Sequence, residues 1–405
     1  MKQLALLYLV AVLLPLTTLP TLAQEWEPYN ELYDLYPSAL LAMSNVKGDP
    51  DDEANSHNLG DLNGLMGIHF KAARPNTRVR LTMTCTGGIK LFNTATVDVT
   101  VPNAGEDYLI APVVPFDEVR LASVRQTQNT YVTYGVTVNG RQLPTRTERI
   151  LVHPVNVCPF GVSHGDDDYT STDFLFAAYV NEDHPQVDRI LQEALRKKYV
   201  SAFLGYQGEK LDVYRQVMAI WRVLQERGIK YSSITTTVAD NENVNSQHVR
   251  FIDESLNNTQ ANCVDGSVLF ASVLRKIGIE PILVTIPGHM FVGFDLDEEG
   301  KRQAYLETTM LGTAPGEFEV KNTALARSLL GTDDDLDIFS IFGKDNKKVD
   351  IERFIAAIQT GGKTYADNKQ GIEREHDDFS KLRVSEARQL GILPIMYVGK
   401  PVAGR

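Results

Sequence analysis

Three residues in the second half of the chain have the types and the order that thiol chemistry requires. Cys263 opens an expected helix, His289 begins an expected strand, and Glu307 ends the strand that follows. A thiol attacks as a thiolate, and a helix N-terminus favours that negative charge through its free N–H groups and the helix dipole. The thiolate needs a base within hydrogen-bond reach and a third group that orients the base. The pattern predicts a triad with Cys263 as nucleophile, His289 as base and Glu307 as orienting carboxylate.

The helix that carries the cysteine is predicted to run from about Cys263 to Ile277. Apolar residues recur within it at spacings of three and four, and Gly278 follows in the position of a C-terminal cap. Asn262 and other polar residues before the cysteine are suitable N-terminal caps. Cys263 is therefore expected in the first turn.

The other two triad residues belong to an expected β-hairpin. Strands are predicted over residues 281–286, 290–296 and 303–308. The turn Pro287-Gly288 delivers His289 to the mouth of the second strand. If the hairpin pairs as the turn over residues 297–300 indicates, His289 and Glu307 lie near the same end and face the helix.

Each triad residue also has a structural interpretation when it is taken alone. A single cysteine in a helix is usually part of the core, a single histidine usually has a structural role, and a glutamate at a strand end usually faces solvent. His248 is a competing base, but it lies in a polar stretch with no orienting strand. The joint order of the three residues favours the triad over these alternatives.

Four segments around these residues resemble the core of the bacterial transglutaminase-like superfamily. They are Asn262–Ser267, Leu274–Pro281, Pro287–Gly293 and Tyr305–Thr309. The resemblance covers about residues 185–315 and implies a papain-like fold with a Cys-His-Asp triad. Cys263, His289 and Glu307 occupy the triad positions. The family often supports the oxyanion with a side chain upstream of the cysteine, and Gln247 is the candidate here.

The chain departs from the family pattern at each triad position. Glu307 is followed by Thr308-Thr309 where the family usually has aspartate, proline and threonine. Val264 follows the cysteine where tryptophan is common, and Met290-Phe291 follows the histidine where Ala-Trp is common. Glutamate can orient an imidazole as aspartate does, so the triad is retained. The resemblance does not imply the protein-crosslinking specificity of animal transglutaminases.

The first residues have the layout of a secretory signal peptide. Lys2 precedes an apolar run over residues 4–16, and the small residues Thr21 and Ala23 indicate cleavage after Ala23. The run is shorter than the roughly 20 residues that span a bilayer, and no later run is long enough for a membrane span. We expect an exported protein, periplasmic or extracellular, that begins at Gln24.

The chain is predicted to be an α+β protein of several parts. With 405 residues, two or three domains of roughly 150 residues are expected. The parts are a signal peptide over 1–23, an N-terminal extension over 24–60, an antiparallel, immunoglobulin-like β-sandwich over 61–160, a linker over 161–184, a transglutaminase-like domain over 185–315 and a mostly helical C-terminal segment over 316–405 that packs on it.

Two patterns carry this division. Strands expected over 78–85, 95–101 and 130–138, with Asn139-Gly140 as a hairpin turn, favour the sandwich. From Pro185 onward the apolar period becomes helical. The aspartates at 166–168 lack the spacing of an EF-hand calcium loop, so a solvated linker is favoured there.

The charge and the cysteines limit the partners. The net charge is −12 and no dense Lys/Arg cluster occurs, which argues against nucleic acid. Export with three cysteines predicts that Cys85 and Cys158 form a disulfide and that Cys263 stays free, although all three could also be buried and inert. We expect neither a metal nor a cofactor.

These observations favour a secreted, thiol-dependent acyl-transfer enzyme that hydrolyses a peptide or isopeptide amide. Water is the default acceptor because nothing in the sequence indicates an amine site. Its partner would be a peptide or protein amide, with a component of the cell envelope as a possible one. The alternative is a catalytically silent binding or scaffold protein of the cell envelope, with the sandwich as its working part.

Overall fold

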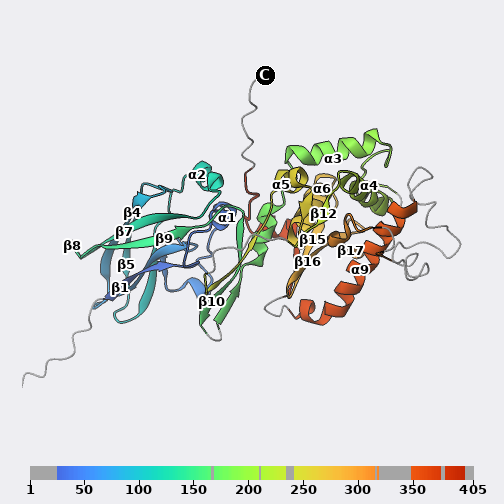
Figure 1. Cartoon of the computed structure of the whole chain (residues 1–405). Helices are drawn as coiled ribbons and strands as arrows, with labels where there is room; N and C mark the ends of the chain where they lie inside the picture. Colours follow the sequence, from blue (N-terminus) through green and yellow to red (C-terminus); the bar gives the residue numbers. More distant parts are fainter. Residues whose placement is uncertain are drawn as a thin grey trace, which may run out of the picture.

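The computed structural model describes residues 25–165, 168–208, 211–233, 241–314, 317–318, 348–374 and 379–396. Figure 1 shows a β-rich lobe built from the N-terminal part of the chain and a second lobe in which helices surround a sheet. The predicted α+β class is confirmed. The expected signal peptide lies outside the described residues. Among the residues described, no helix is both long enough and apolar enough to cross a bilayer.

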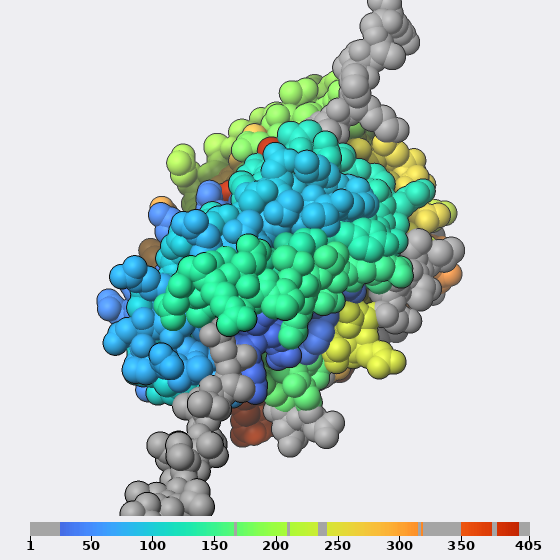
Figure 2. All heavy atoms as spheres, turned by 90° about the vertical axis from the view of Figure 1, so that its left-hand side faces the viewer, coloured from blue at the N-terminus to red at the C-terminus, as the bar shows by residue number. Residues whose placement is uncertain are grey.

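The N-terminal lobe contains two sheets that share one apolar core. One sheet has the order β1 (Glu25–Asn30), β3 (Met66–Lys71), β6 (Asp107–Ala111), β2 (Asn58–Gly60). The other has the order β5 (Thr94–Val101), β4 (Thr77–Gly88), β7 (Gln128–Val138), β8 (Arg141–Gln142), with β9 (Arg146–Val152) also paired to β7. Three short helices, α1 (Pro37–Ala42), η1 (Glu53–Asn55) and α2 (Glu118–Ser123), complete the lobe. Figure 2 views its outer face, where the residues coloured blue to teal form most of the surface.

Local sequence explains much of this lobe. Alternate residues of β4 and β7 are buried, which is the pattern expected of strands with one face on a core. Asn139 and Gly140 both have positive φ values, 50° and 83°, as a tight hairpin turn requires, so the predicted hairpin is confirmed. Two features differ from the expectation. β1, in the expected extension, pairs with β3, and β2 pairs with β6 in parallel.

The expected linker over 161–184 forms ordered structure instead. β10 (Val157–Gly165) pairs with β11 (Asp168–Ser171) on one side and with β13 (Val244–His248) on the other. The 3₁₀ helix η2 (Asp173–Tyr179) follows. β10 is mostly buried, as a strand of the core would be. Its second partner, β13, lies far along the chain, and a local sequence pattern cannot reveal such a pairing. The polar run at its tip explains the expectation of a linker.

The second lobe is built on a four-stranded antiparallel sheet. Its order is β17 (Gln303–Leu306), β16 (His289–Asp295), β15 (Pro281–Ile286), β18 (Ser380–Arg383). The helices are α3 (Pro185–Arg196), α4 (Asp212–Glu226), α5 (Ile252–Asn258), α6 (Cys263–Lys276), α9 (Lys348–Glu373) and α10 (Val384–Gln389). Short elements are β12 (Lys230–Tyr231), paired in parallel with β14 (Gln260–Ala261), and η3 (Thr308–Met310). α6 packs on β15 and β16, and α9 packs on β17.

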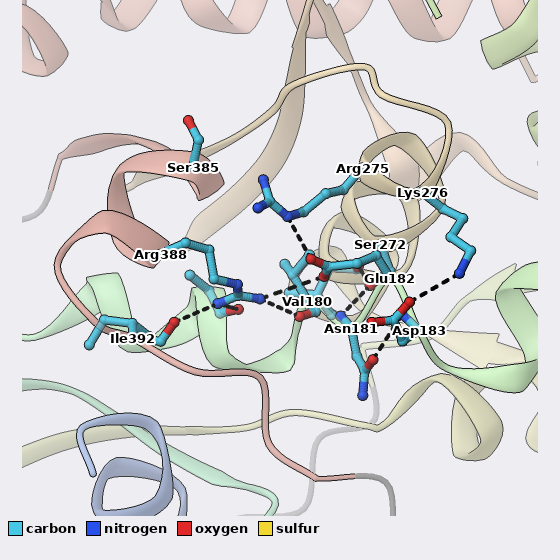
Figure 3. Close-up of polar contacts among 12 residues, drawn as sticks. Val180, Asn181, Glu182, Asp183, Ser272, Arg275, Lys276, Ser385, Arg388 and Ile392 are labelled. Atoms are coloured by element: carbon cyan, nitrogen blue, oxygen red, sulfur yellow. Dashed lines mark hydrogen bonds and ion pairs between the residues drawn. The ribbon is translucent and has the colours of Figure 1, made fainter. Parts of the chain in front are cut away.

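The C-terminal segment is fastened to the rest of the second lobe by polar contacts (Figure 3). β18 pairs with β15, and Arg388 of α10 donates to the carbonyl oxygen of Val180 at 2.7 Å. Glu182 beside it accepts from Arg275 of α6 at 2.7 Å. The sheet that carries His289 is thus completed by the last described part of the chain, which the sequence predicted only as a helical segment.

Candidate active site

Cys263 is the first residue of α6, as predicted. Asn262 caps the helix, because its side-chain oxygen accepts from the backbone N–H of Asp265 at 2.8 Å. The carboxylate of Asp265 in turn accepts from the backbone N–H of Asn262 at 2.9 Å, which completes a capping box. The local sequence therefore fixes the start of the helix at the cysteine, where unpaired N–H groups favour an anion.

A buried ion pair ties this helix start to the segment after β13. Asp265 is fully buried and accepts from both the backbone N–H and a guanidinium nitrogen of Arg250, each at 2.7 Å. β13 carries Gln247, so the pair holds the strand of Gln247 against the first turn of α6. The sequence analysis missed this pair, although the capping pattern of Asn262 and Asp265 was a readable signal.

His289 and Glu307 lie together at one end of the sheet. The Nε2 atom of His289 is 2.8 Å from Oε2 of Glu307, which is only 5% exposed. The other carboxylate oxygen accepts from the backbone N–H and the hydroxyl of Thr309, at 3.1 and 2.6 Å. The backbone N–H of Glu307 donates to the carbonyl oxygen of Ala357 in α9. Glu307 is thus held from both ends, as an orienting group must be.

The charges of this pair follow from its surroundings. Burial acts to raise the pKa of Glu307, but the hydrogen bonds and positive charge of His289 and the bonds from Thr309 lower it more, so it lies below its usual range. Hydrogen bonds to Cys263 and then to Glu307, opposed by burial, raise the pKa of His289 to about 10. The raised pKa favours the imidazolium form of His289 beside Cys263. Since Nε2 is bonded to Glu307, Nδ1 is the ring nitrogen left for the thiol.

A pocket with a volume of about 150 Å³ opens beside the sulfur. Cys263, His289 and Gln247 line it together, so the structure brings three of the four predicted site residues to one cavity and Glu307 stands behind His289. Its other walls come from Phe160, Tyr169, Ser171, Asp173, Phe176, Val264, Thr285, Ile286, Pro287, Gly288 and Met290. His248, the competing base, does not line this pocket, and burial lowers its pKa.

Gln247 is the fourth residue of β13 and lines the same pocket as Cys263. It lies on β13 opposite Cys158 of β10, and its amide nitrogen donates to the carbonyl oxygen of His248 at 2.8 Å. The amide dipole is therefore oriented by the backbone while the side chain reaches the pocket. Its role at the oxyanion stays a prediction.

The predicted disulfide between Cys85 and Cys158 is wrong in this structure, where all three cysteines are free thiols. Cys85 lies on β4, where its sulfur is 3.2 Å from the hydroxyl oxygen of Thr130, whereas Cys158 lies on β10 in another sheet and is fully buried. Burial raises the pKa of the Cys158 thiol well above its usual value. The odd count suggested pairing, but the two positions are built into separate sheets.

Several residues of the site gave no recognised signal in the sequence. Thr309 lies two residues after Glu307 and was noted only as part of a departure from the family pattern. Tyr231 is near the triad. Burial raises its pKa, and the nearby groups Cys263 and Glu307 raise it further. Of the aromatic residues that line the pocket, Tyr169 and Phe176 lie in the expected linker, and Phe160 is the last residue of the expected sandwich. Among the described residues, no group of three metal-ligating side chains occurs.

Comparison with known proteins gives no relative for the chain. No family model matches it, and neither a curated protein nor a solved structure does. The chemistry of the site is therefore argued from its geometry.

Proposed function

We propose that this protein is a thiol-dependent acyl-transfer enzyme that hydrolyses a peptide or isopeptide amide. The observation that carries the proposal is that Cys263, at the start of α6, and His289, hydrogen-bonded to the buried Glu307, line the same pocket. A cysteine at a helix start, packed against a sheet with the base and the carboxylate, also supports membership of the transglutaminase-like superfamily.

Acylation would use the thiolate–imidazolium pair. The sulfur of Cys263 attacks the carbonyl carbon, a C–S bond forms, and the oxygen becomes an oxyanion. Backbone N–H groups in the first turn of α6 and the side-chain amide of Gln247 are the available donors for that charge. The imidazolium of His289 then gives its proton to the leaving nitrogen, the C–N bond breaks, and the amine departs.

Water would complete the cycle. Neutral His289 removes a proton from a water molecule that attacks the thioester, and the C–S bond breaks to release a carboxylic acid. The proton on His289 and the thiolate of Cys263 are thereby restored. Glu307 stabilises the imidazolium and holds the ring, since its other oxygen is fixed by Thr309.

Two measurements on the full chain test the proposal. The first is the rate of iodoacetamide alkylation of Cys263 between about pH 5 and pH 9, in the unaltered protein and in His289→Gln. The second is cleavage of a panel of acetylated aminoacyl aminomethylcoumarin amides, with the acyl-enzyme sought by intact mass. We expect alkylation well below pH 8 that depends on His289, and amide cleavage lost in Cys263→Ala. Alkylation that is unaffected by His289, with no amide cleaved, would favour the silent envelope module.

We also propose that the protein is exported. The apolar N-terminal residues and the small residues Thr21 and Ala23 support this. Sequencing of the mature N-terminus after expression with the leader should give Gln24 as the first residue. A chain that retains Met1 in the cytoplasm would contradict the proposal.

A further inference from the structure

The pocket beside Cys263 has an aromatic wall that the proposed mechanism does not use. Phe160 of β10 and Phe176 of η2 are stacked, with ring centroids 5.9 Å apart and planes inclined by 24°. Tyr169 of β11 lies across β10 at Gly161, where a Cβ atom would stand 1.8 Å from its hydroxyl oxygen. Glycine is therefore needed at position 161 for Tyr169 to close this side of the pocket.

One carboxylate belongs to the same wall. Asp173, the first residue of η2, lines the pocket and is partly exposed. Within the part of the chain that the structure describes, its carboxylate makes no hydrogen bond and no ion pair, and no lysine or arginine lines the pocket. Among the described residues of the lining, the only cation is His289, which is engaged by Cys263 and Glu307. The wall therefore carries a negative charge that no protein group in the lining neutralises.

The chemistry of the wall suits one kind of ligand. Aromatic faces attract a cation, and apolar walls cover the methylene stem of a long basic side chain while its charged end meets a carboxylate. An acidic side chain would bring its charge close to Asp173 without a compensating cation. The volume of about 150 Å³ is below the roughly 300–1,000 Å³ of pockets for drug-sized ligands, so it suits a single side chain.

We infer that the pocket selects amides with a basic side chain, lysine or arginine, next to the scissile bond, and that Asp173 is the specificity-determining residue. This inference rests on the proposed function, because the selected group must present its amide to Cys263. The basic group is a recognition element and stays protonated beside Asp173. It does not act as the nucleophile that resolves the acyl-enzyme.

The first test compares kcat/KM for acetylated aminomethylcoumarin amides of lysine, arginine, norleucine and glutamate. Norleucine has the apolar stem of lysine without its charge, so the lysine-to-norleucine ratio isolates the cation. We expect a ratio of about tenfold to a hundredfold, as for a hydrogen bond to a charged group. Glutamate should be the poorest substrate. A ratio near one in the unaltered protein would overturn the inference.

The matched variants are Asp173→Asn and Asp168→Asn. Both remove one negative charge from the same part of the chain, but Asp168 is exposed on β11 and does not line the pocket. We expect the lysine-to-norleucine ratio to fall to about one in Asp173→Asn and to persist in Asp168→Asn. Equal ratios in the two variants would overturn the role of Asp173. If Asp173→Asn does not fold, the salt dependence of the ratio in the unaltered protein replaces it, and a ratio unaffected by salt counts against the inference.

A binding test separates the inference from the proposed function. Cys263 is alkylated with iodoacetamide in the presence of n-butylammonium chloride or n-butanol, which have the same number of heavy atoms, at constant ionic strength. We expect n-butylammonium to protect the thiol at least about fivefold more effectively, and Asp173→Asn to remove the difference. Equal protection, with alkylation that still depends on His289, would refute the inference alone. Alkylation independent of His289, with no amide cleaved, would refute both.

Discussion

The two sides of the pocket are positioned by different kinds of interaction, local on one side and long-range on the other. The side with Cys263, His289 and Glu307 is built from element ends, and each end has a local cause: a capping box, a Pro-Gly turn and a strand end. The opposite side, with Phe160, Tyr169 and Asp173, lies on β10, β11 and η2, and its place depends on β10 pairing with a strand far along the chain, as in the pair of Val157 with His248. Local sequence therefore predicts the catalytic residues of a site more reliably than it predicts the residues that select the substrate.

The two sides are also stabilised differently, which sets what a substitution should change. Polar contacts of fixed geometry hold the triad side, among them the bonds between His289 and Glu307 and between Arg250 and Asp265. Stacked rings form the opposite side. Changes on the triad side should alter rate or stability, whereas changes at Asp173 should alter selectivity among substrates.

The largest effect is expected for His289. In His289→Gln the amide can still donate to Glu307, so the fold should be retained while the proton shuttle is lost. We expect the rate of amide cleavage to fall about 10⁴-fold or more, as for the histidine of serine-protease triads. His289→Ala should lose as much rate and also lower the melting temperature, because it leaves the buried carboxylate unpaired. Amide cleavage that persists in His289→Gln would contradict the role of His289 as the catalytic base.

The next effect concerns Glu307→Gln. Thr309 offers two donors to one side-chain oxygen, so the glutamine oxygen should face Thr309 and its NH₂ group should face His289. The imidazole must then accept at Nε2, which puts the proton on the wrong nitrogen for the cycle. We expect a loss of about 10²- to 10⁴-fold in kcat with a nearly unchanged melting temperature. A lower melting temperature with an unchanged rate would assign Glu307 a structural role only.

A smaller effect on rate but a clear one on stability is expected at the start of α6. Asp265→Ala removes the acceptor of two Arg250 bonds and half of the capping box. Breaking a buried ion pair from one side costs about 3–5 kcal/mol in unfolding free energy, measured by urea titration. Arg250→Met with Asp265→Leu removes both charges and serves as the control, which should recover part of this loss. Equal losses of unfolding free energy in the single and double variants would show that the unpaired charge of Arg250 does not cause the destabilisation.

A smaller loss of rate is expected when Gln247, the candidate oxyanion donor, is replaced. Gln247→Ala removes one side-chain donor, while the backbone N–H groups of α6 remain. We expect a loss in kcat of about 10²-fold or less, with little change in KM. Gln247→Glu serves as a comparison, since it keeps the size but replaces the donor with a charge of the same sign as the oxyanion. A change confined to KM would remove Gln247 from the oxyanion and leave it as a binding residue.

The limits of sequence-based prediction follow the same division. β15 has the bounds that were predicted, and α6 begins at the predicted residue. The pairing of β18 with β15 and the bond from Glu307 to Ala357 were beyond reach, because they join segments that are distant in the chain. The disulfide prediction failed because a cysteine count carries no information about sheet positions.

The last prediction concerns the pH dependence of stability contributed by His289. Its pKa is raised from the ordinary 6.5 to about 10 by Cys263 and then Glu307. A raised pKa in the folded state stabilises the protein fully below about pH 6.5, and that contribution is lost as the pH rises through about 10. The unfolding free energy of the unaltered protein minus that of His289→Gln should therefore decrease steadily over this interval. Lysine and tyrosine residues also titrate there, but they are common to both proteins and cancel in the difference. Cys263→Ala should narrow this pH interval, because it removes the largest cause of the raised pKa of His289. A stability difference that does not depend on pH would contradict the raised pKa of His289.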